Sequence, residues 1–272
     1  MLLSAIARLL LYVGATIVMG DSADRWIAAR YDSASNARLR LAWVGVALSL
    51  LTLALLQARD MELDATGAAW QMLLTETAWG RGWSALAVSA MFGVAAAAWC
   101  APRIVATGCA LLLAVTMGGL GHASADDAMP LLSRVIDAAH VLGVGAWLGG
   151  LLLMTRSATV DEWQRYSRMA SVAAPAVVIS GVLASLRRLQ LPPLAFGVTS
   201  PSLATVVASP YGALLFVKTA LVLIVLALGL KHRRRILSEH APSGKSIRIE
   251  LALAVLVLSV TAVLTGTAPP GE

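Results

Sequence analysis

Two histidines and an aspartate occupy positions where ionisable side chains are unexpected. His122 follows the apolar stretch 104–121, and Asp137 and His140 lie within the next apolar stretch, 133–154. Ionisable groups are costly inside a bilayer and by default mark a functional site. Imidazole nitrogens bind transition metals, and a neighbouring carboxylate either binds the metal or orients the ring. These three residues therefore predict a metal site.

The spacing of these residues favours copper as the metal. Asp137 and His140 are three residues apart, so they share one face of a helix, and Trp147 continues that face. His122 lies across a short turn and is expected to approach His140. Imidazole together with thioether suits copper, Cu(I) in particular, better than magnesium or calcium. Two thioethers lie near the same predicted membrane level, those of Met117 and Met129.

Each of these residues also has a structural interpretation. A histidine within a membrane can simply hydrogen-bond a neighbouring helix, and His122 stands where it could cap one. Asp137 can neutralise a buried cation, and Lys218 is the candidate because it reaches a depth similar to that of His140. A structural pair of Asp137 with Lys218 and a role in transport are both compatible with the sequence.

Further ionisable or soft side chains lie toward the opposite membrane face. Thiolates of Cys100 and Cys109 could receive copper there as an inner exit, although a buried free cysteine usually behaves as a small hydrophobic residue. Glu250 begins the last apolar stretch and is expected to meet the basic connection before it or the interface, with ion exit as the alternative. His232 and His240 lie in a basic connection and are expected to be solvated.

Composition indicates the class of protein that must position these residues. Hydrophobic residues make up 58% of the 272-residue chain and charged residues only 13%, and several apolar runs are long enough to cross a bilayer. Abundant glycine suits close helix packing in lipid. The basic balance does not indicate nucleic-acid binding, because no soluble domain is expected. The two cysteines form no disulfide framework or CxxC motif, and no cleavable signal peptide is expected.

The chain is predicted to fold as one all-α transmembrane domain over residues 1–272, a bundle of eight helices. The connection 57–82 is expected at the membrane surface, partly as an interfacial helix. The predicted spans are 3–20, 41–57, 83–101, 104–121, 133–154, 169–186, 211–230 and 249–267.

Charge distribution predicts the orientation of this bundle. The connections after the first, third, fifth and seventh spans carry most of the lysine and arginine residues. The positive-inside rule places them in the cytoplasm and both termini on the periplasmic side. His122, Asp137 and His140 then lie toward the outer face of a bacterial inner (plasma) membrane, with His140 roughly 10 Å deep.

Several motifs, taken in order, resemble the CopD/PcoD copper-resistance family of inner-membrane proteins. They are GHA at 121–123, D-x-x-H-x6-W-L-G-G at 137–150, Ser-Gly at 180–181, Y-G-x5-K at 211–218, and a basic connection leading to Glu250. The resemblance covers most of the chain and the eight-span plan. It implies copper import from periplasm to cytoplasm, often with a periplasmic CopC-type copper carrier. Many members have a histidine in the first span, where this chain has Leu10 or Leu11.

The sequence leaves three functions open, none of them enzymatic. The first is a copper transporter in which His122 and His140 capture the ion and Asp137 orients or balances it. No GxxxxGK[ST] motif is present, so energy would come from ion gradients, membrane potential or trapping of the metal. The second is a haem-binding electron-transfer protein with both histidines as axial ligands. The third is a docking partner for a periplasmic copper carrier.

Overall fold

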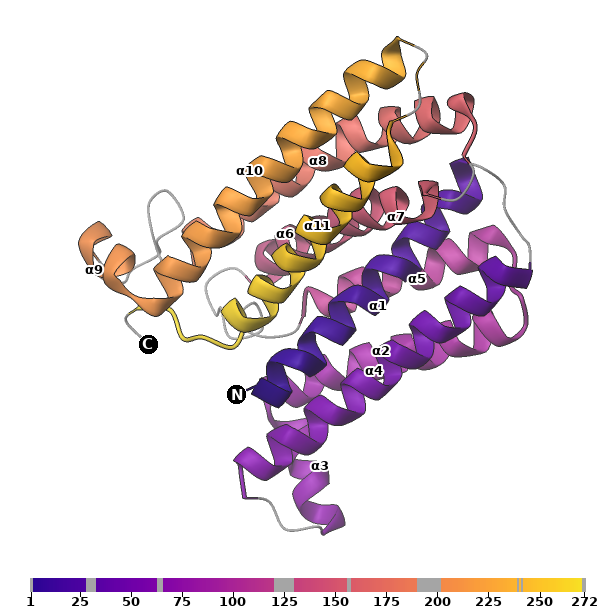
Figure 1. Ribbon diagram of the computed structural model, residues 1–272. Helices are drawn as coiled ribbons and strands as arrows, with labels where there is room; N and C mark the ends of the chain where they lie inside the picture. The colour runs from indigo at the N-terminus through magenta and orange to yellow at the C-terminus, as the bar shows by residue number, and fades with distance from the viewer. Residues whose placement is uncertain are drawn as a thin grey trace.

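The computed structural model describes residues 2–27, 33–62, 66–119, 130–155, 158–189, 202–238, 240 and 242–270. Within these ranges the secondary structure is helical, without strands (Figure 1). The helices are α1 (Leu2–Ile27), α2 (Ser33–Asp60), α3 (Gly67–Glu76), α4 (Ala78–Ala98), α5 (Arg103–Met117), α6 (Pro130–Val144), the π-helix η2 (Gly145–Gly149), α7 (Gly150–Met154), α8 (Val160–Arg188), α9 (Leu203–Ala208), α10 (Pro210–Leu237) and α11 (Gly244–Leu264).

Seven helical segments in the described ranges are long and apolar enough to cross a membrane. One of them is the continuous run of α6, η2 and α7, which carries Asp137 and His140. Large apolar side chains on the outside of the bundle, such as Leu41, Leu131 and Phe216, are more than 70% exposed and suit contact with lipid. The chain is therefore a multi-pass membrane protein.

The predicted fourth span corresponds to helix α5, which is shorter than the seven helical segments of membrane-spanning length. Helix α5 has 15 residues, or about 22 Å, whereas a membrane-spanning helix usually needs about 20 residues. The all-α prediction thus agrees with the structure. The count of eight spans and the periplasmic side of both termini stay predictions.

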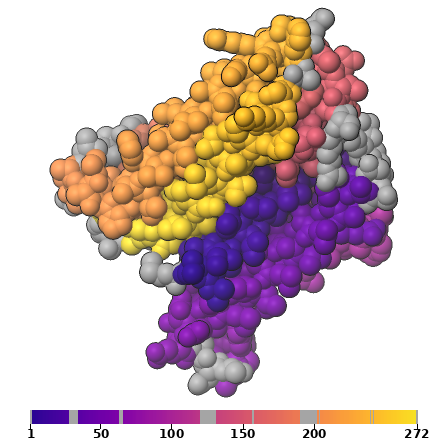
Figure 2. Space-filling view, in the orientation of Figure 1, coloured from indigo at the N-terminus to yellow at the C-terminus, as the bar shows by residue number. Residues whose placement is uncertain are grey.

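Helix α1 lies at the centre of the bundle. It packs against α2 and α5 on one side and against η2, α7 and α11 on the other. In the space-filling view, α1 borders the surface formed by α11, and α2 lies on the other side of α1 (Figure 2). One apolar core is built mainly from α1, α2, α4 and α5, and a second from η2, α7, α8, α10 and α11. Helix α1 therefore joins two separately packed halves.

Glycine permits the close approach of α1 to the π-helix. A Cβ atom added at Gly20 would lie 2.6 Å from the Cα of Gly149, and one added at Gly149 would lie 2.9 Å from the Cα of Gly20. Real side chains do not tolerate such separations, so the two backbones can touch here only because neither residue has a side chain. Small residues at helix contacts are the usual means of association in lipid.

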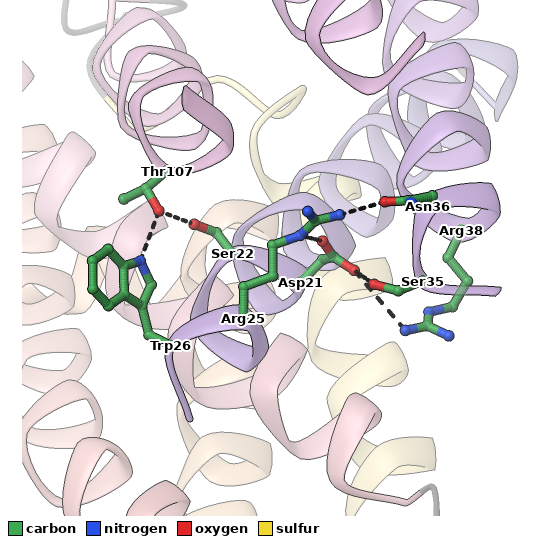
Figure 3. Close-up of polar contacts among 8 residues, drawn as sticks. All are labelled: Asp21, Ser22, Arg25, Trp26, Ser35, Asn36, Arg38 and Thr107. Carbon is green, nitrogen blue, oxygen red and sulfur yellow. Dashed lines mark hydrogen bonds and ion pairs between the residues drawn. The ribbon is translucent and has the colours of Figure 1, made fainter. Parts of the chain in front are cut away.

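A buried polar network ties the end of α1 to α2 (Figure 3). Arg25 Nε donates a hydrogen bond to Asp21 at 2.7 Å, and Ser35 of α2 donates to the other Asp21 oxygen at 2.8 Å. Arg25 also donates to the side-chain oxygen of Asn36 at 3.0 Å. The stretch 21–40, which the sequence placed in a connection, is thus largely helical. These bonds satisfy charged groups that would otherwise be buried without partners.

The same end of α1 is bonded to α5. Ser22 Oγ lies 2.9 Å from the hydroxyl of Thr107, and Trp26 Nε1 donates to that hydroxyl at 2.9 Å (Figure 3). The guanidinium carbon of Arg103 lies 4.2 Å from the centre of the Trp26 ring, a cation–π contact. These contacts fix the position of the short helix α5 beside α1.

Caps determine where two site-bearing helices begin. Thr159 and Glu162 form a reciprocal capping box at the start of α8. Ser209 caps α10 by accepting a hydrogen bond from the backbone N–H of Gly212, and Pro210 occupies the first turn.

We expect Gly149→Ala to destabilise the protein, because the new methyl group would meet the backbone of α1. Overpacking of this kind typically costs about 1–3 kcal/mol. Thermal unfolding of the detergent-solubilised protein, followed by fluorescence-detected gel filtration, measures the effect. The matched control is Gly108→Ala in α5, where an added Cβ has no neighbour within 4 Å. Equal melting temperatures for both variants would contradict this account of the α1–η2 contact.

Candidate metal-entry site

His140 is held against α8 by its Nδ1 atom. Nδ1 lies 3.1 Å from the carbonyl oxygen of Val177 and 3.1 Å from the hydroxyl oxygen of Ser180. The absence of a side chain at Gly181 leaves room for the ring, since a Cβ there would lie 3.2 Å from the Cε1 atom of His140. The Ser-Gly pair at 180–181, one of the motifs noted in the sequence, therefore forms the surface against which the imidazole packs.

This geometry determines which ring nitrogen is available to a metal. A carbonyl oxygen can only accept, so Nδ1 must carry the hydrogen that it donates to Val177. The Ser180 hydroxyl donates to the Ala176 carbonyl at 2.6 Å and can accept from the same imidazole hydrogen. Nε2 then keeps its lone pair, and the described residues provide it with no hydrogen-bond partner. An imidazole anchored through one nitrogen is oriented to bind metal through the other.

Asp137 forms an ion pair with α8. Its Oδ2 atom lies 3.5 Å from Nη2 of Arg187, and both side chains are largely buried. The charge of Lys218 also acts on Asp137 and on His140, and that of Arg188 acts on His140. The sequence identified Lys218 as the partner of Asp137 but missed Arg187, because that residue was placed in a loop after the sixth span. Lys218 as a charge partner stays a prediction.

The other predicted ligands lie in different surroundings. His122 and Met129 fall outside the described residues. Met117, at the end of α5, is buried in the apolar core of the N-terminal half. Among the residues that the structure describes, no three His, Cys, Asp or Glu side chains gather closely enough to hold a metal ion. Metal binding by the predicted set thus stays a prediction, and His140 is the member whose geometry is defined.

The two cysteines proposed as an inner exit lie in and after the α4–α5 turn. Cys100 is exposed and has a left-handed backbone, with φ of 50°. Arg40 Nη2 lies 3.2 Å from its sulfur and also donates to the Ala98 carbonyl, at the end of α4. Cys109 is half-buried in α5 and packs against the N-terminal core. Their role in copper exit stays a prediction.

The π-helix η2 interrupts the span that carries the site. Trp147, expected on the face of Asp137 and His140, approaches α10 instead: its Cζ2 atom lies 3.9 Å from the position that a Cβ at Gly229 would occupy. A single π-turn adds a residue to the helix and rotates the subsequent turns by about 100°. The backbone carbonyl of Trp147 accepts a hydrogen bond from the Tyr166 hydroxyl at 2.9 Å. Helical periodicity could not reveal this offset.

The expectation that His232 is solvated is wrong. Helix α10 continues through the basic run to Leu237, and His232 is only 5% exposed. Its Nδ1 atom lies 2.6 Å from Oε2 of Glu250, which is also buried and meets the basic stretch, one of the two surroundings expected for it. The basic composition of the stretch concealed this buried face, whereas His240 is exposed as expected.

Comparison with known proteins covers most of the chain, and Asp137 and His140 lie between the two segments that family models match. Residues 1–132 match the family model described as the N-terminal domain of copper resistance protein D-like proteins, and residues 161–264 match the model described as copper resistance protein D. A curated "Copper resistance protein D" from Pseudomonas syringae pv. tomato is 28% identical, with 85% of this chain and 83% of the relative covered. The chain belongs to the copper resistance protein D family.

Membership in the copper resistance protein D family confirms the resemblance seen in the sequence motifs and connects the chain with copper resistance. No solved structure matches the chain. The two matched segments include all of α1 and α5 and nearly all of α8, together with α10 and α11. Helix α8, which contacts His140 and pairs with Asp137 through Arg187, therefore lies almost entirely within matched sequence.

We expect Asp137→Asn to destabilise the protein, because Arg187 would lose its carboxylate partner while remaining buried. Removing one member of a buried ion pair costs on the order of 3 kcal/mol. Arg187→Gln should have a similar effect, and the double variant should be more stable than the sum of the two losses predicts. Thermal unfolding of the four proteins completes this double-mutant cycle. Strictly additive losses would show that the pair contributes no coupling energy.

Proposed function

We propose that the protein transports copper across the bacterial inner membrane, from periplasm to cytoplasm, with His140 as a ligand at the entry side. The single observation that carries this proposal is the anchoring of His140 Nδ1 to α8, which leaves the lone pair of the ring on Nε2, where it can bind metal. Family membership supplies the link to copper. His122, Met117 and Met129 are the proposed additional ligands, and Cys100 and Cys109 the proposed inner exit.

The charges around His140 favour Cu(I) as the transported ion. Within the described part of the site, one carboxylate, Asp137, stands against the cationic side chains of Arg187, Arg188 and Lys218. At equal distance a monovalent ion experiences half the repulsion that a divalent ion does. Cu(I) also prefers soft and neutral ligands such as imidazole and thioether. Asp137 acts by lowering the net positive charge beside the imidazole.

The placement of the entry site on the periplasmic side rests on the arrangement of charges along α10. Lys218, near the start of this helix, interacts with Asp137, whereas a cluster of basic residues occupies its last turns. The positive-inside rule assigns the basic end to the cytoplasm and hence the His140 end to the periplasm. A periplasmic CopC-type copper carrier is the proposed donor of the ion.

Copper uptake into proteoliposomes tests this function. We expect wild-type protein to carry Cu(I) inward, and His140→Ala to lower the uptake rate by at least about ten-fold, because the oriented ligand is lost. Ser180→Ala should have a smaller effect, since the Val177 carbonyl still anchors the ring. His240→Ala is the matched control, because that histidine is exposed outside the long helices, and it should retain wild-type uptake.

Three outcomes would contradict the proposal. Absence of uptake with the carrier still bound would indicate a docking protein. A Soret band in the purified protein, lost in His140→Ala, would indicate haem ligation. Equal uptake by His140→Ala and His240→Ala would remove His140 from the copper path.

A further inference from the structure

A second pair of ionisable side chains is buried at the opposite end of the bundle from His140. Glu250 of α11 is 1% exposed and His232 of α10 is 5% exposed. Glu250 Oε2 lies 2.6 Å from His232 Nδ1, and the other ring nitrogen, Nε2, lies 2.7 Å from the hydroxyl of Ser246. The carboxylate and the imidazole are in direct contact, although the contact does not have the geometry of an aligned hydrogen bond.

This arrangement can exist in two protonation states. With one hydrogen on the imidazole, at Nδ1, the pair carries a net negative charge, and the Ser246 hydroxyl donates to Nε2. With a second hydrogen, at Nε2, the pair is neutral overall, and the same hydroxyl accepts from Nε2 instead. A serine hydroxyl can rotate to serve either state. The pair can therefore gain or lose one proton while the Ser246 contact is kept.

The basic side chains that α10 and α11 carry near the pair are exposed or bonded to backbone carbonyls. From α8, Tyr166 interacts electrostatically with Glu250, while its hydroxyl donates to Trp147 of η2. Arg233 of α10 is directed to the Ser167 carbonyl at 3.2 Å, and Arg248 of α11 donates to the Gly244 carbonyl at 3.3 Å. Helix α1, which packs against α11, carries two buried acidic residues, Asp24 and Asp21, the latter paired with Arg25.

The two buried sites are held by the same helical segments. Helix α8 seats His140 through Val177 and, nearer its start, bonds η2 through Tyr166. The span that carries His140 also carries Trp147, whose ring and the Oε1 atom of Glu250 both lie within 4 Å of the space above Gly229. A change of charge at Glu250 therefore acts on the two elements that position the entry ligand.

The geometry points to His232 and Glu250 as an internal proton-binding site, through which proton binding is coupled to copper movement. The coupling rests on the proposed transport function, whereas the proton site does not. A net negative charge buried between helices is costly, and uptake of one proton removes it. The proton is thus the ligand of this site.

Acid–base titration of the purified, metal-free, full-length protein in nanodiscs tests the proton site. Glu250→Gln should bind about one proton fewer per chain than wild type over the titration, because proton uptake follows the ionisable groups present. His232→Gln should show the same loss. Glu76→Gln removes an exposed carboxylate of α3 and serves as the matched control for carboxylate number. Its titration curve is the reference for the loss of a surface carboxylate.

The shape of the titration difference decides the outcome. A difference for Glu250→Gln that coincides with that of Glu76→Gln, with none for His232→Gln, would overturn the proton site. The same conclusion would follow if Glu250→Gln lost bound Cu(I), because the carboxylate would then be a metal ligand. Gel filtration and thermal unfolding identify variants that fail to fold. In that case Ser246→Ala, which removes only the hydroxyl that contacts His232, is titrated instead, and its proton uptake should occur at a different pH from that of wild type.

Proteoliposomes with a trapped pH indicator test the coupling. In wild type, a change of about one pH unit on the side facing Glu250 should change Cu(I) uptake several-fold, since it changes the protonation ratio ten-fold. Glu250→Gln should transport with little pH response. If wild-type Cu(I) uptake does not change with this pH, the coupling is overturned, whereas the proposal of copper transport is unaffected. Absence of any wild-type uptake would refute the proposed function, while the titration still decides the proton site.

Discussion

Hydrocarbon offers no hydrogen bonds, so each polar group that the helices carry into the bundle needs a partner supplied by the protein. Asp21 is satisfied by Arg25 and Ser35 where α1 meets α2. Asp137 meets Arg187 between α6 and α8. His232 meets Glu250 between α10 and α11. The Asp21–Ser35 bond, the Asp137–Arg187 pair and the His232–Glu250 pair each join two helices, and together they restrict how neighbouring helices rotate against one another.

Apolar packing selects the orientation of neighbouring helices less strongly than polar pairs do. At the α1–η2 contact it relies on two residues that have no side chain. Gly20 and Gly149 bring the backbone of α1 against the π-helix, and this contact links the two cores of the bundle. The α1–η2 contact and the polar pairs have complementary roles. Close packing determines which helices are neighbours, while the polar pairs determine which faces they present.

The sequence predicted an all-helical membrane protein because long apolar runs are a strong and local signal. It also identified Asp137 and His140, since charge within such a run is conspicuous. Arg187 was missed as a partner because it follows an apolar run, and pairing between distant segments leaves no local pattern. His232 was missed because the basic residues around it suggested a loop, whereas the helix continues and buries one side of that run.

The length of α10 makes the protein sensitive to the lipid around it. Its 28 residues extend over about 42 Å, roughly 12 Å more than a typical hydrocarbon layer. Basic residues in the last turns anchor that end among phosphate headgroups, so a thinner or thicker bilayer must be accommodated by tilt. Tilt of α10 would carry Lys218 toward or away from the imidazole of His140. Membrane thickness would in this way tune the electrostatic potential at the mouth of the bundle.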